Sequence, residues 1–293
     1  FCQFRCLKKK TNKADKSCLK NNTTLSGTAV LTKARSRIGG VLPLQADGYA
    51  CTTEQLLDVL LAVSVGKETI EQVCADLKMK VGAETIRGYF NDQFAVEKLS
   101  QLQESINAGL QKSLSGDLRG GKLEVAMDYH DQPYYGKTGQ AEGLWVGGQA
   151  KQGTTKMDRV ATAYIIKNGY RLTLGIKFVL PGESVKEVVE YLLKQLEGLE
   201  IEIRCLYLDR GFEGVELVRY LKEIKQPAII ACPIRGTTGG VKALCVGKKS
   251  YRTKHIFKSA KHGLEEVEMA MFKGLTTTTK KGGPGPSTST NQG

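Results

Sequence analysis

The sequence lacks any long apolar run, and no segment reaches the roughly 20 apolar residues that a membrane-spanning helix needs. Its N-terminus also lacks the apolar core that a secretory signal peptide requires. These absences favour a soluble protein of the cell interior. The chain begins at Phe1 rather than at a methionine, which is consistent with a fragment.

Cysteine pairs in metal-binding spacing are also missing, although the chain has eight cysteines. Three of them, Cys2, Cys6 and Cys18, lie near one another, but no CxxC pair or matching histidine completes a zinc site. The other five are scattered among apolar segments: Cys51, Cys74, Cys205, Cys232 and Cys245. We interpret these five as small core residues of a protein in a reducing compartment.

Charge is present in excess and is unevenly distributed, with a net charge of +13. Residues 1–47 hold ten lysines and arginines against two aspartates. This basic arm is what contact with a phosphate backbone would require. The alternative is a leader that only aids solubility. In either case we expect residues 1–27 to be a disordered basic leader.

Helical spacing of apolar residues dominates residues 28–114, which we expect to form an all-α domain. The expected helices span Glu54–Val63 after an N-cap at Thr53, Glu68–Leu77, Ala83–Asn91 and Val96–Leu114. A short turn containing Gly82 separates the second helix from the third, as in a helix-turn-helix. That third helix would offer Thr85, Arg87 and Asn91 to a DNA groove. The alternative is a three-helix cluster with no DNA partner.

From residue 122 onward the pattern changes to strands alternating with helices, over a domain that we place at 122–274. The strands are expected at Lys122–Asp128, Val160–Lys167, Arg171–Leu180, Ile201–Leu208 and Ala228–Pro233, with helices at Ser184–Leu196 and Glu213–Ile224. Asn168-Gly169 predicts a tight hairpin between the second and third strands. The order β-β-β-α-β-α-β predicts a ribonuclease H-like mixed sheet flanked by helices, with the first and fourth strands adjacent.

Two aspartates, Asp128 and Asp209, each follow an apolar strand. On adjacent strands, their carboxylates would meet at one edge of the sheet and could hold a divalent metal, which prefers oxygen ligands. The chemistry indicated is metal-assisted phosphoryl transfer. The alternative for either residue alone is a turn former or a helix N-cap.

Two longer motifs surround these aspartates. Residues 128–136 read Asp-Tyr-His-Asp-Gln-Pro-Tyr-Tyr-Gly, and residues 207–212 read Tyr-Leu-Asp-Arg-Gly-Phe. The first resembles the first-aspartate block of DDE transposases of the IS4-like type, and the second resembles their second block. The ISH3-like insertion sequences are the most similar group, and the resemblance covers roughly residues 50–272.

This resemblance implies a cut-and-paste DNA transposase of the prokaryotic cytoplasm and nucleoid. Its implied partners are double-stranded DNA, at the terminal inverted repeats and at the target, and a second copy of the chain in a homodimer. Its implied cofactor is Mg²⁺ or Mn²⁺ in a two-metal site. By position, Asp128 would bridge both ions and Asp209 would hold one of them.

Basic residues near the two motifs are further candidates for DNA contact. Arg210 directly follows Asp209 and could neutralise a phosphate. Lys151 and Lys156 lie in the polar stretch before the second expected strand, with a solvated surface as the alternative.

Other motif residues have more structural interpretations. We expect Gly211 to let the backbone turn sharply, and Asp131 to cap or orient the turn after the first strand. His130 is interpreted mainly as an exposed loop residue. Tyr134 and Tyr135 would either stack on a base or pack the loop.

The third acid of the family triad, a glutamate on a later helix, has no counterpart that we can assign. Glutamates follow Asp209 at positions 213, 216 and 223, which is too early, and at 265, 266 and 268, in a segment that alternates like a strand. Residues 275–293 form a low-complexity tail. We therefore expect a chain truncated before the third acid. The alternatives are an inactive DNA-binding remnant and another ribonuclease H-like nuclease.

Overall fold

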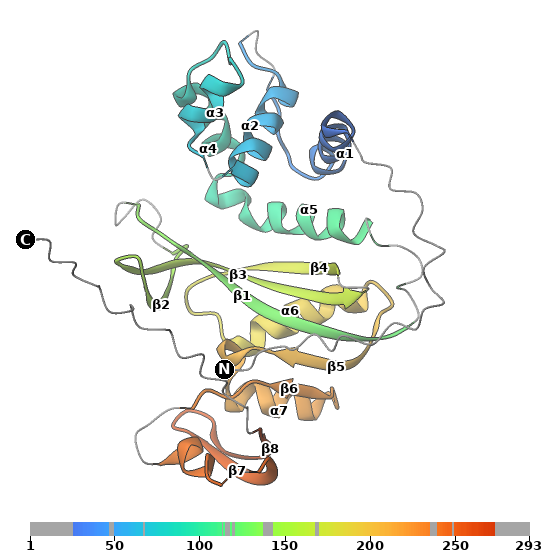
Figure 1. The fold of residues 1–293 in the computed structure, drawn as a ribbon, viewed down its shortest axis with the longest axis vertical. Helices are drawn as coiled ribbons and strands as arrows, with labels where there is room; N and C mark the ends of the chain where they lie inside the picture. Colours follow the sequence, from blue (N-terminus) through green and yellow to red (C-terminus); the bar gives the residue numbers. More distant parts are fainter. Residues whose placement is uncertain are drawn as a thin grey trace, which may run out of the picture. The chain divides into compact units, whose positions relative to one another are not determined.

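The computed structural model describes residues 26–46, 50–66, 68–112, 114, 118, 121–136, 143–167, 170–234, 239–247 and 249–272. The chain divides into two compact units, residues 1–113 and 114–293 (Figure 1). Residues 1–25 of the expected leader, all of the expected tail and the Asn168-Gly169 turn lie outside the described residues. No described helix is both long and apolar enough to cross a bilayer.

The first unit is helical. Its elements are α1 Gly27–Gly39, α2 Thr53–Gly66, α3 Ile70–Asp76, α4 Ala83–Gln93, the 3₁₀ turn η1 Val96–Lys98, and α5 Leu99–Lys112. The last four helices lie where the apolar spacing predicted them. Helix α1 was not predicted, because it contributes no buried residue and therefore has no strong apolar face. Its N-cap is Ser26, whose hydroxyl accepts a hydrogen bond from the Ala29 backbone N–H at 3.1 Å.

The core of this unit joins α2, α3 and α4. Leu56, Val59, Val73 and Ile86 are buried together with Cys51 and Cys74. Burial raises the pKa of the Cys74 thiol, as expected for a cysteine used as a core residue.

The second unit is built on a mixed sheet. Its strands are β1 Lys122–Pro133, β2 Val146–Lys151, β3 Thr154–Lys167, β4 Tyr170–Val179, β5 Glu202–Leu208 and β6 Ala228–Ile230. The main helices are α6 Val185–Glu197 and α7 Val215–Glu223. Strand β2 was not predicted, because it is short and largely exposed and its residues do not alternate between apolar and polar.

The strand order is β2-β3-β1-β5-β6, with β4 pairing the remaining part of β3. Strand β3 is antiparallel to β1 and to β4, whereas β5 is parallel to both β1 and β6. The predicted adjacency of the first strand and the strand after α6 is therefore confirmed. This adjacency brings two segments that are distant in sequence to the same part of the sheet.

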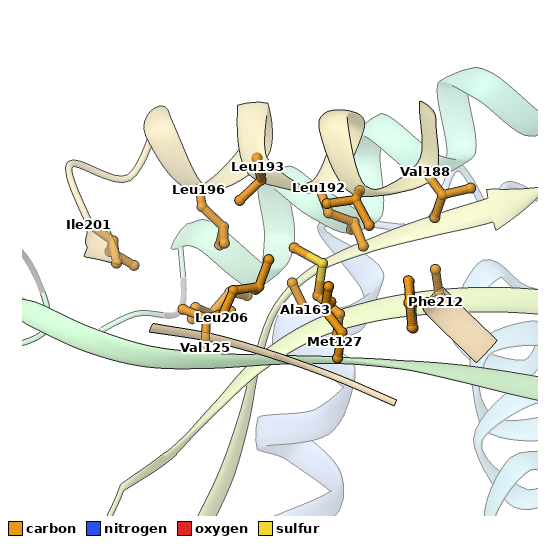
Figure 2. Close-up of a cluster of buried hydrophobic side chains, with 14 of the residues drawn as sticks. Val125, Met127, Ala163, Val188, Leu192, Leu193, Leu196, Ile201, Leu206 and Phe212 are labelled. Carbon is orange, nitrogen blue, oxygen red and sulfur yellow. The ribbon is translucent and has the colours of Figure 1, made fainter. Parts of the chain in front are cut away.

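One face of this sheet, the core face, is packed by α6 and α7. Side chains of α6 such as Leu192 and Leu196 meet Val125, Met127 and Leu206 from the strands (Figure 2). The N-cap of α6 is Ser184, which forms a capping box with Glu187: the Ser184 hydroxyl and the Glu187 carboxylate each accept a hydrogen bond from a backbone N–H.

A β-hairpin follows the sheet. Its strands are β7 Tyr251–Ser259 and β8 Gly263–Met271, preceded by the 3₁₀ turn η4 Gly240–Leu244. It packs against α7, where Arg219 and Lys222 both bind the Glu265 carboxylate, at 3.2 Å and 2.5 Å. The side-chain hydrogen bond from Lys222 is the main cause that lowers the pKa of Glu265.

Candidate active site at the end of strand β5

The register between β1 and β5 places the two candidate aspartates next to each other. Met127 pairs with Leu208 in the parallel ladder, and Asp128 and Asp209 are the next residues on each chain. Adjacent strands lie about 4.8 Å apart, so the two backbones at this point are separated by roughly that distance. The geometry therefore juxtaposes the two residues that the sequence singled out.

Both aspartates belong to the face of the sheet opposite α6. Met127 and Leu208 are buried on the core face, and side chains alternate along an extended chain. Asp209 keeps an extended backbone, with φ −72° and ψ 171°, so the alternation continues through it. We call this side the carboxylate face, defined by Asp128, His130, Thr162, Tyr164 and Arg171.

Strand β1 does not end at Asp128, which corrects the sequence-based prediction. It continues to Pro133, paired with β3, from Asp128 opposite Thr162 to Pro133 opposite Met157. The polar residues after Asp128 obscured this extension, because their partner is another strand rather than a hydrophobic layer. Strand β5 does end at Leu208, so Asp128 lies inside a strand at the level where its neighbour stops. The Asp128 side chain is 33% exposed.

The loop after β5 is fastened to β1 by an aromatic stack. The Tyr129 and Phe212 rings are parallel within 4°, with centroids 4.1 Å apart. Tyr129 follows Asp128, and Phe212 ends the 3₁₀ turn η3 Arg210–Phe212 that follows Asp209. The stack therefore holds the two aspartate-bearing segments together from the core face.

Gly211 is required by close approach rather than by backbone conformation. A Cβ at this position would lie 2.8 Å from Cδ2 of Tyr129, which is closer than such atoms pack. Its φ is not in the left-handed region, so the expected sharp glycine turn is not the reason for this residue. Within the motif Asp-Arg-Gly-Phe, Asp209 is thus the candidate metal ligand. Gly211 leaves space for the Tyr129 ring, and Phe212 stacks on that ring.

Asp131 lies within β1 and does not cap a turn, which corrects a second expectation. Its carboxylate receives two hydrogen bonds from Arg159, at 2.6 Å and 2.9 Å. The hydrogen bonds from Arg159 lower the pKa of Asp131, against a smaller opposing effect of burial. Arg159 also lies 5.0 Å from the centre of the Tyr129 ring, so the pair braces the aromatic stack. Burial raises the pKa of Tyr129 to about 12, so its hydroxyl stays protonated at neutral pH.

His130, Thr162 and Arg171 lie on the carboxylate face near Asp128, and Thr162 and Arg171 were not predicted from the sequence. The His130 Nε2 is 4.0 Å from the Asp128 carboxylate. It accepts a hydrogen bond from the Arg171 guanidinium at 3.1 Å. Thr162, opposite Asp128 on β3, is only 8% exposed and also contacts Arg171. The exposed loop expected for His130 is thus a strand. No local sequence signal identifies Arg171 or Thr162, because their nearness to Asp128 depends on the register between strands.

The remaining motif residues have structural contacts. The Tyr134 side chain lies against Gly136, where a Cβ would collide with the Tyr134 hydroxyl oxygen, so Tyr134 packs the segment. Tyr135 is exposed and donates its hydroxyl to Gln152, at 3.0 Å from Oε1.

The basic candidates near the motifs differ in how they are engaged. Lys151 Nζ donates to the Asp131 backbone oxygen at 3.2 Å, and Lys156 Nζ lies 4.6 Å from the Trp145 ring centre. Arg210 is exposed in η3. All three stay candidates for DNA contact.

The helical unit presents its three DNA-binding candidates unequally. Thr85 and Asn91 are exposed on α4. Arg87 forms ion pairs with Glu71 and with Glu84, the second at 2.9 Å. These carboxylates neutralise the Arg87 charge, so Arg87 is the weakest of the three candidates on physical grounds. The role of all three in DNA binding stays a prediction.

Several glutamates that follow Asp209 lie on elements that do not place them beside Asp128. Glu216 and Glu223 lie on α7, which packs the core face, while Glu265, Glu266 and Glu268 lie on β8. The strand predicted for this last group is confirmed. Within the described ranges, no group of three or more His, Cys, Asp or Glu side chains is arranged to hold a metal ion.

Two carboxylates are nevertheless a fitting donor set for magnesium. Mg²⁺ is commonly held by one or two protein carboxylates, with water and substrate phosphates completing its octahedral shell. Asp128 and Asp209 share one face and one level of the sheet, and both are accessible from solvent.

Comparisons with known proteins give distant structural likeness but no sequence match. No family model matches the sequence, and no curated protein matches it. Among solved structures, the chain is similar to one described as a piggyBac transposase synaptic complex with hairpin DNA, at 12% identity and a TM-score of 0.41. The alignment covers 85% of this chain and 55% of the other, so the chain spans about half the length of that transposase.

Proposed function

We propose that this chain is a DNA transposase of the DDE type, in which Asp128 and Asp209 bind the catalytic metal. The observation that carries the proposal is the ladder in which Met127 pairs with Leu208, because it brings the two carboxylates to one place. The two motifs that resemble IS4-like transposases surround the same two residues. Their Tyr129 and Phe212 side chains stack on each other, which gives the joint occurrence of the motifs a physical reason.

The sheet order supports a ribonuclease H-like arrangement. Three strands, β4, β3 and β1, are successively antiparallel, and β5 and β6 then continue in parallel from β1. Helices α6 and α7 connect the later strands. In such a fold the carboxylates at the end of the central strands carry metal-dependent phosphodiester chemistry, which is the role proposed for Asp128 and Asp209.

The proposed chemistry assigns simple tasks to the residues. Bound Mg²⁺ or Mn²⁺ would supply Lewis-acid activation of the attacking oxygen and stabilisation of the leaving oxygen. Asp128 and Asp209 would hold the metal ion in place. Asp128 is fixed within strand β1, and Asp209 is fixed by the Tyr129–Phe212 stack that follows it. Arg210 would offset phosphate charge. The DNA partners, inverted-repeat ends and a target duplex, and assembly as a homodimer belong to the same proposal.

A cleavage assay tests the enzymatic part of this proposal. Duplex DNA carrying the terminal inverted repeats of the element would be incubated with the full chain and Mg²⁺ or Mn²⁺. We expect metal-dependent nicking at the repeat end that is lost in Asp128→Ala and in Asp209→Ala. The matched control is Asp76→Asn, which removes the charge of an exposed aspartate in the helical unit. Cleavage that survives both alanine substitutions would refute the proposal.

A non-cleaving DNA-binding protein is the second candidate. It is favoured by one observation: the described glutamates on α7 and β8 are not arranged with Asp128 as a third ligand. This candidate predicts salt-sensitive DNA binding without cleavage in any metal. The cleavage assay, run with binding measured in parallel, separates the two candidates.

A further inference from the structure

The Arg171 guanidinium is built into the carboxylate face beside Asp128. Its Cζ lies 3.6 Å from the centre of the Tyr164 ring, which is stacking distance for a cation on an aromatic face. One terminal nitrogen, Nη2, contacts Thr162 Oγ1 at 3.0 Å and His130 Nε2 at 3.1 Å. The Arg171 backbone pairs with Ile166 on β3, two residues beyond Tyr164. From there its side chain extends over the Tyr164 ring toward Thr162, the residue opposite Asp128.

The hydrogen bonds fix the form of the histidine. Arginine is always a donor, so His130 Nε2 must accept from it and the ring proton is carried by Nδ1. The Thr162 hydroxyl completes the triangle, at 3.3 Å from the same Nε2. Since Thr162 is almost fully buried, it provides a rigid support, and the guanidinium is held in one orientation.

Within the described residues, Arg171 has no carboxylate partner, unlike three other arginines of the same unit. Arg159 pairs with Asp131, Arg204 with Glu124 and Arg219 with Glu265. Within the described residues, no carboxylate pairs with Arg171, and its Nε and Nη1 groups have no hydrogen-bond partner. The two contacts of Nη2 leave Nε and Nη1 open, and each of these groups can donate a charge-assisted hydrogen bond to a phosphate oxygen.

We propose that Arg171, supported by Thr162, His130 and Tyr164, binds a phosphodiester of the DNA strand that lies across Asp128. This inference rests on the proposed function and deepens it by naming a DNA-positioning residue outside both aspartate motifs. The physical need is clear, because two carboxylates repel an approaching phosphate. A cation on the same face, held beside Asp128 by Thr162 and His130, offsets that repulsion without pairing with the aspartates.

The test is a DNA-binding titration of the full chain in EDTA, so that its result does not depend on the metal site. The probe is a short duplex DNA with a fluorescent label, and anisotropy is measured over a series of salt concentrations. We expect Arg171→Ala to weaken binding about tenfold and to lower the slope of log affinity against log salt by about one. Arg171→Lys should keep the slope and lose part of the affinity, because a lysine cannot reproduce the planar group that stacks on Tyr164 and donates from several nitrogens.

The matched control is Arg204→Ala, which removes an exposed arginine of the same sheet that Glu124 already neutralises. We expect its affinity and salt slope to equal those of the unsubstituted chain. The inference is overturned if Arg171→Ala binds like the unsubstituted chain, or if Arg204→Ala loses as much as Arg171→Ala.

Thr162→Val covers the case in which Arg171→Ala fails to fold, as judged by circular dichroism. It removes the hydroxyl that holds the guanidinium while keeping the shape of the side chain. A loss of a few-fold in affinity supports the inference, and unchanged affinity overturns it. These outcomes are distinct from failure of the proposed function, which shows as cleavage that does not require Asp128 and Asp209.

Discussion

The two faces of the sheet are made by alternate residues of the same strands, yet they are built for different purposes. On the core face, Val125, Met127 and Leu206 are buried against α6 (Figure 2). On the carboxylate face, the intervening residues include Asp128, and Ile166 and Ile229 are 67% and 58% exposed. The comparison teaches that stability and the proposed chemistry are separated by a single step along the chain. Substitutions on the core face should therefore lower stability, whereas substitutions of the aspartates on the carboxylate face should remove metal binding and leave stability nearly unchanged.

The largest effect on stability is expected from the core face. Leu206→Ala removes a fully buried side chain from the centre of the cluster and leaves a cavity. We expect the free energy of unfolding to fall by about 2 to 5 kcal/mol. Urea denaturation followed by circular dichroism measures it. Its counterpart Asp128→Ala should leave stability nearly unchanged; a loss as large as that of Leu206→Ala would break the distinction between the faces.

Gly211→Ala tests the link between the two motifs. The added methyl group meets the Tyr129 ring, which cannot retreat because it is stacked on Phe212. We expect a loss of about 1 to 3 kcal/mol in the free energy of unfolding.

Gly214→Ala is the matched control for this substitution, because a Cβ there meets nothing within 4 Å. It should change stability by less than about 0.5 kcal/mol. Equal losses in the two variants would show that close packing on Tyr129 is not the reason for Gly211.

Asp131→Asn weakens the brace under Tyr129. Removing the charge-assisted hydrogen bonds with Arg159 should cost about 1 to 3 kcal/mol at neutral pH. The folded-state pKa of Asp131 lies below its ordinary value of 3.8. The stabilisation is therefore fully present above the unfolded pKa and is lost as the pH falls through the folded pKa.

Thermal unfolding at a series of pH values checks this prediction. The difference between the natural chain and Asp131→Asn should be constant from neutral pH down to about pH 5 and shrink below pH 4. A difference that grows as the pH falls would contradict the assigned direction of the pKa shift.

The smallest effect is expected at Ile229, on the carboxylate face of β6. Its side chain is already largely exposed, so Ile229→Ala should cost less than about 1 kcal/mol. Chemical denaturation alongside Leu206→Ala provides the measurement. A cost near that of Leu206→Ala would mean that this face is packed in solution.

The sequence predicted the elements whose side chains follow one strong periodicity. Helix α6 and strand β5 lie close to their predicted ranges because each has a regular apolar side. The second half of β1 and strand β2 were missed because their residues show no apolar alternation. Both segments are held by pairing with β3, and β2 is also largely exposed to solvent. Helix α1 was missed because it has no buried residue and therefore no apolar side that repeats at helical spacing.

The candidate site was predictable only in part. Asp128 and Asp209 were found through their motifs and the expected order of strands. Arg171 and Thr162 were not, because their relation to Asp128 depends on cross-strand register, which leaves no local pattern in the sequence. The function of Gly211 was also out of reach, since the contact with Tyr129 exists only after β1 and β5 have paired.

Metal binding by the paired aspartates is the most direct test of the central claim. Mn²⁺ would be titrated into the full chain, and free Mn²⁺ would be measured by electron paramagnetic resonance at neutral pH. We predict a saturable site that is lost in Asp128→Ala and equally in Asp209→Ala, and retained in Asp76→Asn. A site that survives either alanine substitution would contradict the claim that the two carboxylates hold one metal centre together.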